Sequence, residues 1–132
     1  MSHFIRILLT TLLFFLPQYS SDAAKPSWIL MGELKDTYFY IDAANITHNN
    51  SSVSFWTLMD YKGDIHKDGS VMTFQTIYCT KNTNTSLRVM SFADHMATGG
   101  ITWQKTYESN EIIEDPIVPG SFIDDVKDKL CK

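Results

Sequence analysis

The stretch that decides the fold is IVPGSFIDDVKDKLCK, the last sixteen residues of the chain, from Ile117 to Lys132. Its apolar side chains recur at three- and four-residue spacing, which places them on one side of an α-helix. They are Phe122, Ile123, Val126 and Leu130. Most of the charged residues between them face water in such a helix. The sequence therefore predicts a short amphipathic helix at the C-terminus, the one helix that the pattern indicates after the leader.

Signals for the start of this helix come directly before its apolar pattern. Ser121 is a preferred N-cap residue, and Asp124 follows it three positions later. Pro119 and Gly120 interrupt the chain just ahead. Acidic residues come early in the segment and basic residues come late, which is the order that the helix dipole favours.

The helix ends at Cys131, and the only other cysteine of the chain is Cys79, at the end of a strand-like run. Two cysteines in an exported chain are typical of a single disulfide. We therefore expect these two to pair and to link the helix to a sheet. Closing such a loop stabilises a fold by roughly 4 kcal/mol in the chain-entropy estimate. The alternative is a pair of buried free thiols.

The N-terminus has the pattern of a signal peptide: a basic start, then an apolar run over residues 7–16 that is short for a membrane span. Small residues favour cleavage after Ala23 or Ala24, and an uncleaved anchor is the alternative. No cysteine follows the apolar run, so the lipid attachment of bacterial lipoproteins is not expected. We predict a signal peptide over residues 1–23 and one domain over residues 24–132, periplasmic or secreted, with no membrane anchor after cleavage.

The charge balance narrows the class of partner. The formal net charge is −4, and no basic stripe is present that would exchange counterions with phosphate groups. A nucleic-acid partner is therefore not expected. Outside the leader there is also no polybasic or amphipathic segment of the kind that lies on a membrane surface.

Between the leader and the helix, six runs have the composition and alternation of β-strands. They cover residues 27–34, 37–42, 53–61, 70–79, 86–93 and 101–107. Short polar segments connect nearly all of them, as in hairpins, and residues 42–46 form either one helical turn or a loop. The sequence predicts an α+β fold, a twisted six-stranded antiparallel meander with the C-terminal helix packed on one face and disulfide-linked to it.

Alternation along the 70–79 run decides what each face of this sheet carries. If Cys79 points at the helix, so do the side chains two, four, six and eight positions before it, and the next strand adds several more. They are Ile77, Gln75, Thr73 and Val71, with Leu87, Val89, Ser91 and Ala93. This face is modestly apolar and suits one helix.

The opposite face, which has no helix to cover it, then carries large, soft and aromatic side chains. The candidate partner face comprises Met72, Phe74, Tyr78, Met90 and Phe92, with Thr76 among them. We also expect some of Phe55, Met59 and Trp103 there. These side chains either meet another molecule or are buried by the sheet's own strands if the sheet curls.

The sequence has no recognisable motif that combines catalytic or metal-binding residues. The stretch Asp64–Gly69 begins like a calcium loop, but it has a histidine at its third position and Gln75 at its twelfth, so we interpret it as a charged hairpin loop. Asp94 and His95 lack the ordered motifs of a hydrolase triad. The histidines after the leader lie in separate connections without metal-ligand spacing. We expect no enzyme activity, no metal site and no cofactor.

Several features spread along the chain after the leader match one known family in order and spacing. They are Trp28, the run YFYID over residues 38–42, Val53, Trp56, Leu58, Asp60, Tyr61, Cys79, the run PGS over residues 119–121, and Cys131. In these features the chain resembles the surface-adhesin E family of small exported bacterial domains. The resemblance implies an antiparallel sheet with a disulfide-linked C-terminal helix, self-association and, from the family's named member, adhesion to host matrix and serum proteins. The chain differs from an outer-membrane adhesin in lacking a lipidation cysteine.

Two functions from different classes follow from these observations. The first is an exported, non-catalytic, adhesin-like binding module of the envelope, whose partner is a second copy of the chain on the helix-free face or a host or envelope protein. The second is a periplasmic small-molecule-binding or lysozyme-inhibitor-like module that uses a loop or cleft. The first predicts a flat apolar face and dimers in solution, and the second predicts a monomer with a concave pocket lined by polar residues.

Overall fold

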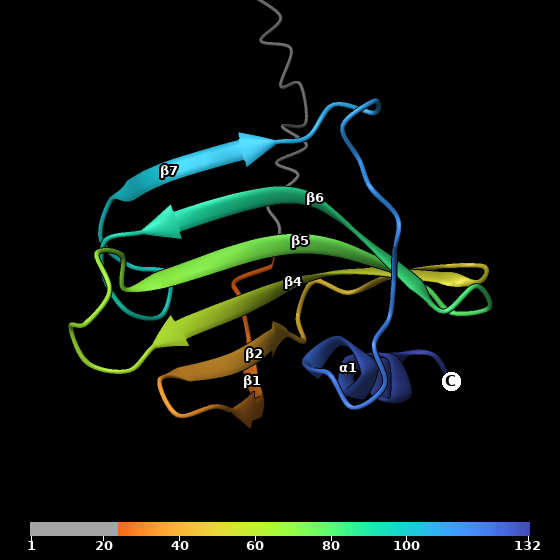
Figure 1. The fold of residues 1–132 in the computed structure, drawn as a ribbon, viewed down its shortest axis with the longest axis horizontal. Coiled ribbons are helices and arrows are strands. Elements are labelled where there is room, and N and C mark those ends of the chain that lie inside the picture. Colours follow the sequence, from red (N-terminus) through yellow and green to blue (C-terminus); the bar gives the residue numbers. More distant parts are fainter. Residues whose placement is uncertain (1–23) are drawn as a thin grey trace, which may run out of the picture.

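The structure, a computed structural model, describes residues 24–132 as one antiparallel sheet with a single helix (Figure 1). The elements are β1 (Trp28–Glu33), β2 (Thr37–Asp42), β3 (Thr47–Asn49), β4 (Ser52–Tyr61), β5 (Ser70–Tyr78), β6 (Thr83–Phe92), β7 (Ile101–Thr106), β8 (Asp115–Pro116) and α1 (Phe122–Leu130). The α+β class is confirmed. The signal peptide predicted over residues 1–23 lies outside the described part of the chain. In that part, no helix has the length and apolar character needed to cross a membrane.

The six long strands follow one another across the sheet as the sequence predicts. Their order is β1-β2-β4-β5-β6-β7, and each neighbouring pair is antiparallel. β4 and β5, at the centre, are rich in aromatic and β-branched residues, which suit a pleated and partly buried surface. The predicted meander is therefore confirmed.

Two short strands and one boundary differ from the prediction. β3 forms a hairpin with β4 through Asn50, whose φ of 51° is left-handed, and β8 adds two residues beside β6. Strands of two or three residues are too short to show an alternation of polar and apolar residues, so the sequence does not predict them. β6 begins at Thr83, inside a stretch predicted as a polar turn, because the turn closes early at Asn82 with φ of 55°.

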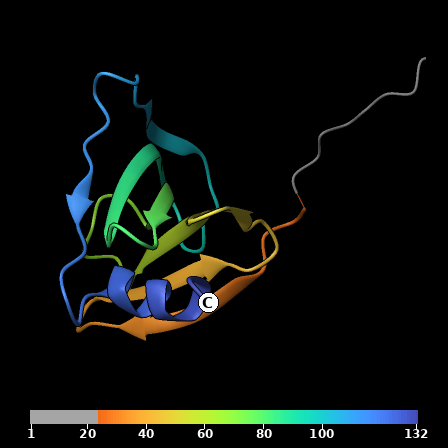
Figure 2. The same cartoon turned by 90° about the vertical axis from the view of Figure 1, so that its right-hand side faces the viewer.

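The sheet curls around the helix. Figure 2 shows β1 and β2 passing beneath α1, while β6 and β7 rise away from it and the segment after β7 descends to the helix. α1 therefore lies inside the curl, and the opposite face of the sheet forms the outside.

The core lies between the inner face of the sheet and α1. Its buried apolar side chains come from three strands, one loop and the helix: Ile41, Val53, Phe55, Ile77, Ile117 and Val126. Leu58 of β4 is also completely buried, but it points to the opposite face of the sheet. Burying each such side chain contributes roughly 1.5–3 kcal/mol. Phe39 of β2 also stacks on Phe122 of the helix, with ring centroids 4.7 Å apart. One helix is enough to cover this part of the sheet.

The helix begins where the sequence places it. The Ser121 side chain accepts the backbone N–H of Asp124 at 3.3 Å, and an Asp124 carboxylate oxygen accepts the backbone N–H of Gly120 at 2.9 Å. Both residues singled out in the sequence, the N-cap Ser121 and Asp124 in the first turn, therefore accept backbone N–H groups at the helix start. Val126, in the middle of the helix, is completely buried.

The predicted disulfide is present, and the alternative of two free thiols is wrong. Cys79 and Cys131 are joined with an S–S distance of 2.03 Å and a Cα–Cα distance of 5.7 Å. One cysteine follows β5 directly and the other follows α1 directly. The link therefore fixes the end of the helix to the end of a central strand of the sheet.

We expect that replacing both cysteines, as Cys79→Ala with Cys131→Ala, will lower the free energy of unfolding by about 4 kcal/mol. The physical reason is the entropy that the unfolded chain regains when the loop across a separation of 52 residues is opened. Urea denaturation followed by circular dichroism measures this change. A reducing agent should weaken the wild type and leave the double variant unchanged. A loss below about 1 kcal/mol would contradict the role given to the disulfide.

Candidate functional site on the helix-free face

The face of the sheet opposite α1, called the helix-free face below, carries all five residues of the candidate partner face. Along β5, Ile77 and Gln75 lie on the helix side, so the alternate positions point the other way. Cross-strand pairing then puts their β6 partners on the same face. The five are Met72, Phe74, Tyr78, Met90 and Phe92, and each is half-buried.

Three further expectations for this face are wrong. Phe55 is completely buried in the core, Met59 lines the inner side of the sheet beside α1, and Trp103 pairs with Ser91, which shares a face with Val71. The first two belong to a run of β4 that is apolar on both faces, so composition does not tell its faces apart. The register of Trp103 depends on the loop before β7, which alternation within one strand does not reveal.

The expected inner-face set is correct in part. Val89 and Ser91 of β6 pair with Thr73 and Val71 of β5 and share the helix side with them. Leu87 has no partner on β5, because the register shifts there by one residue in a β-bulge. The bulge changes which residues of β6 point inward toward its N-terminal end.

Sequence reasoning missed part of the helix-free face. β4 contributes Trp56, whose ring lies 5.2 Å from that of Phe74, and β2 contributes Tyr38 and Tyr40, whose rings are 6.5 Å apart. Leu30 of β1 pairs with Tyr40 and is 52% exposed. The sequence does not give the register of β4 against β5. That register places Trp56 opposite Phe74 and therefore on the same face. The face therefore carries aromatic and methionine side chains on four strands and Leu30 on a fifth, around the completely buried Leu58.

The Tyr40 hydroxyl on this face remains protonated in neutral solution. Burial raises the pKa of Tyr40 above its ordinary value, and the carboxylate of Asp60 and the neighbouring Tyr38 raise it further. The ring therefore presents a neutral phenol, which suits a surface that is only partly wet.

Arg88 of β6 is the cation within this face. It pairs with Phe74 on one side and with Thr106 on the other, and its Nη2 donates to the side-chain oxygen of Gln104 at 3.2 Å. Its Nε is buried without a hydrogen-bond acceptor among residues 24–132. Leaving such a donor unpaired costs about 1–3 kcal/mol, so its presence on this face requires an explanation.

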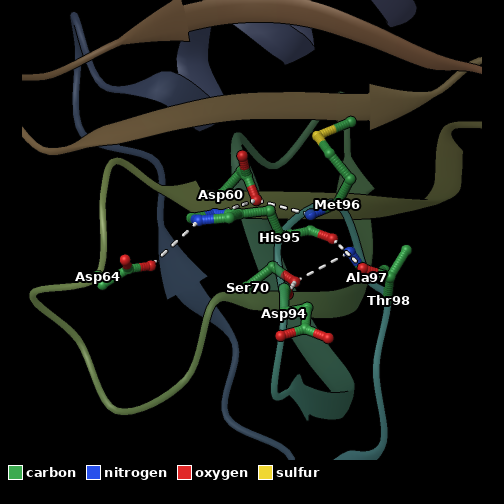
Figure 3. Close-up of polar contacts among 8 residues, drawn as sticks. All are labelled: Asp60, Asp64, Ser70, Asp94, His95, Met96, Ala97 and Thr98. Carbon is green, nitrogen blue, oxygen red and sulfur yellow. Dashed lines mark hydrogen bonds and ion pairs between the residues drawn. The ribbon is translucent and has the colours of Figure 1, made fainter.

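The loop between β6 and β7, residues 93–100 and called the covering loop below, folds back over one end of the helix-free face (Figure 3). Asp60 and Ser70 are paired across β4 and β5 at that end and are almost completely buried. An Asp60 carboxylate oxygen accepts the backbone N–H of Met96 at 2.7 Å, and the Ser70 hydroxyl accepts that of Ala97 at 2.9 Å. These bonds hold the covering loop in place, so it marks the border of the face.

His95 lies beside Asp60 in the covering loop, with Nδ1 3.5 Å from one Asp60 oxygen and Nε2 3.9 Å from Asp64 (Figure 3). The Ser70 hydroxyl donates to the backbone carbonyl of Asp94 at 2.6 Å and is completely buried. That hydroxyl therefore binds the backbone of the loop and is not placed to attack a substrate. Within the described part of the chain, no group of three or more His, Cys, Asp or Glu side chains is arranged to hold a metal ion.

A hollow on the other side of the sheet is called the concave groove below. It has a volume of about 260 Å³ and lies between α1 and the central strands. Its lining residues are Phe39, Thr57, Met59, Thr73, Gln75, Ser86, Val89, Tyr107, Phe122 and Ile123. On its floor, Gln75 Nε2 donates to Thr57 Oγ1 at 3.1 Å, and the Gln75 oxygen accepts from Asn84 at 3.3 Å. The groove therefore has apolar walls over a polar, hydrogen-bonded floor.

Comparison with known proteins identifies relatives of this fold. Residues 28–132 match the family model described as Surface-adhesin protein E. The structure of Haemophilus influenzae protein E is similar, with 14% sequence identity, a TM-score of 0.60, and coverage of 79% of this chain and 83% of that chain. The crystal structure of protein E from non-typeable Haemophilus influenzae is also similar, with 15% sequence identity, a TM-score of 0.59, and coverage of 84% of this chain and 78% of that chain. No curated protein matches the chain significantly.

We expect that Gly69→Ala will displace the covering loop. A Cβ added at Gly69 would lie 2.3 Å from the backbone carbonyl carbon of Asp94, so one of the two segments must move. The free energy of unfolding should fall by about 1–3 kcal/mol, and the amide NMR signals of Met96 and Ala97 should shift.

Gly100→Ala is the matched control, because a Cβ there meets nothing within 4 Å. Equal effects of the two substitutions would contradict the close contact between Gly69 and the covering loop.

Proposed function

Because the chain belongs to the surface-adhesin protein E family, we propose that it is an exported protein-binding module of the bacterial envelope, without catalytic activity, that engages a protein through its helix-free face. The family makes it an adhesin-like surface protein. The leader-like N-terminus and the absence of a lipidation cysteine after it favour a periplasmic or secreted location.

The observation that carries this proposal is the half-buried aromatic surface outside the curl of the sheet. Phe74 and Trp56 lie side by side at its centre, and Met72 and Met90 are paired next to them. Large aromatic and methionine side chains are enriched at protein interfaces, where they bury much area at little entropic cost. Nothing in the described part of the chain covers them as α1 covers the inner face.

Two classes of partner suit this surface. A second copy of the chain can place the same face against itself around a twofold axis, which gives a homodimer with a self-complementary interface. A host or envelope protein can use the same residues. Binding of either partner depends on the large apolar side chains at the centre of the face.

A second candidate function is supported by the concave groove. Its volume of about 260 Å³ is slightly below the range of about 300–1,000 Å³ for ligand sites, and Phe39 and Met59 give it apolar walls above the Thr57 and Gln75 side chains. A concave, partly polar pocket is the feature that a small-molecule-binding module would need, and this groove supports that candidate. The two candidates use opposite faces of the sheet, so substitutions separate them.

For the leading proposal, we expect Phe74→Asp or Tyr78→Asp to weaken self-association at least about 10-fold while cooperative unfolding is retained, because a charged group replaces a large aromatic side chain in the interface. Sedimentation velocity across a concentration series measures the effect. Trp103→Asp is the matched control, since Trp103 is 51% exposed on the other face. A monomeric wild type would contradict the homodimer, and variants that unfold would show that the face is core.

For the second candidate, we expect Val89→Trp to fill the concave groove and to weaken any small molecule bound there at least about 10-fold. Ligand-observed NMR with a fragment library, followed by the side-chain amide signal of Gln75, measures the binding. Phe74→Asp should leave it unchanged. Fragments that bind equally to the Val89→Trp variant, or a library without any binder, would contradict a function for the groove.

A further inference from the structure

Arg88 is the only arginine of the chain after residue 23, and it stands in the middle of the helix-free face. Its neighbours across the strands are Phe74 and Thr106. Met90 follows it on the same face of β6. A guanidinium group is planar, always charged, and suited to bidentate binding of a carboxylate.

The other cations that border this face have acidic partners within the chain. Lys62 lies over the ring of Tyr38, 4.5 Å from its centroid, and pairs with Glu33 at 2.7 Å. These two charges compensate each other without a binding partner.

Lys81 repeats the pattern at the opposite end of the face. It lies 5.2 Å from the centroid of the Tyr78 ring and pairs with Glu114 at 3.5 Å. Arg88 differs from both lysines, because none of the ion pairs among residues 24–132 includes it. Its one hydrogen bond goes to a neutral amide, that of Gln104.

The carboxylates on the same face are engaged elsewhere. Asp42 accepts the backbone N–H groups of Ser27 and Ala44, both at 2.9 Å, and Asp60 accepts from the covering loop. Both are almost completely buried. The positive charge of Arg88 is therefore available to an anionic group of a binding partner.

The single cation and its apolar surroundings favour a protein over a polyanion as the binding partner. A sulfated polysaccharide, a nucleic acid or an anionic membrane is bound by clusters of cations, whereas this face offers one uncompensated cation on a chain of net charge −4. Phe74 lies directly opposite Arg88, and Trp56 and Met72 lie next to Phe74 on the same face. These residues of the face can bury apolar side chains of a partner around the single charge of Arg88.

We propose that the partner of the helix-free face is a protein segment that places one Asp or Glu carboxylate on Arg88, with apolar or aromatic side chains next to it on Phe74, Trp56 and Met72. This inference rests on the proposed function and adds the chemistry of the partner. Arg88 supplies specificity for the carboxylate, and the aromatic residues around it supply most of the buried area.

The test begins with a random peptide library displayed on phage and selected on the purified protein. Enriched peptides should carry Asp or Glu next to aromatic or aliphatic residues, and Phe74→Asp should abolish their binding. One such peptide is then titrated in two forms, with its carboxylate and with the corresponding amide. We expect the amide form to bind wild type at least about 10-fold more weakly, the range of a charge-assisted hydrogen bond.

In the Arg88→Gln variant the two peptide forms should bind equally, whereas Lys129→Gln, which removes the same charge from the exposed side of the helix, should behave as wild type. The comparison of the two peptide forms on wild type needs no variant, so it is decisive even if Arg88→Gln folds poorly. In NMR spectra of the wild type, the Nε–H signal of Arg88, assigned by its loss in Arg88→Lys, should shift with the carboxylate form and not with the amide form.

The possible results separate the two proposals. Peptides that bind through Phe74 but do not need a carboxylate would overturn this inference and leave the proposed function standing. A selection in which no enriched peptide depends on Phe74 would overturn both. Binding of heparin or of phosphatidylglycerol vesicles that depends on Arg88, without any carboxylate-dependent peptide, would show that the face serves a polyanion and would also overturn the inference.

Discussion

The disulfide between Cys79 and Cys131 is the constraint on which the rest of the structure depends. It joins the end of the helix to the strand at the centre of the sheet, and so it decides which face of the sheet the helix covers. Ile77, two residues before the first cysteine, points into the same core as Val126 of the helix. Once the inner face is assigned in this way, the pleat gives the outer face its large side chains. The core alone is small for a chain of this length, so the covalent link also contributes a large share of the stability.

The sequence was informative where the signals are local. The cap at Ser121, the apolar spacing up to Leu130 and the paired cysteines predicted the helix and its attachment, and short polar connections predicted the meander. It was less informative about register. The run around Phe55 and Met59 is apolar on both faces, so alternation did not show that Trp56 points outward. The position of Trp103 depends on the covering loop, which is held by bonds to Asp60 and Ser70 from distant strands. Arg88 was missed as well, although it is the only arginine after the leader and alternates with Met90 and Phe92.

The two faces of the sheet have different physical roles. The inner face combines the buried core with the concave groove, whose polar floor is satisfied by hydrogen bonds within the chain. The outer face is aromatic, half-buried and bounded at one end by the covering loop, and it contains a cation that no carboxylate of the described residues neutralises. A buried donor without an acceptor and an aromatic surface without a cover are both costs in the free protein. A single protein partner on this face would cover the aromatic surface and could offset the charge of the guanidinium group, which is how membership of an adhesin family and the physical character of the face agree.

The central claim is that the helix-free face is covered by a protein where the chain functions. Oxidation footprinting of methionines by mass spectrometry tests it most directly, by comparing cells that produce the protein with dilute purified protein. Met72 and Met90 lie on the helix-free face, and Met59 lies in the concave groove as an internal reference. The account predicts that Met72 and Met90 react readily in dilute solution and are protected on cells, while Met59 reacts alike in both. Equal reactivity of Met72 and Met90 in the two samples would contradict it.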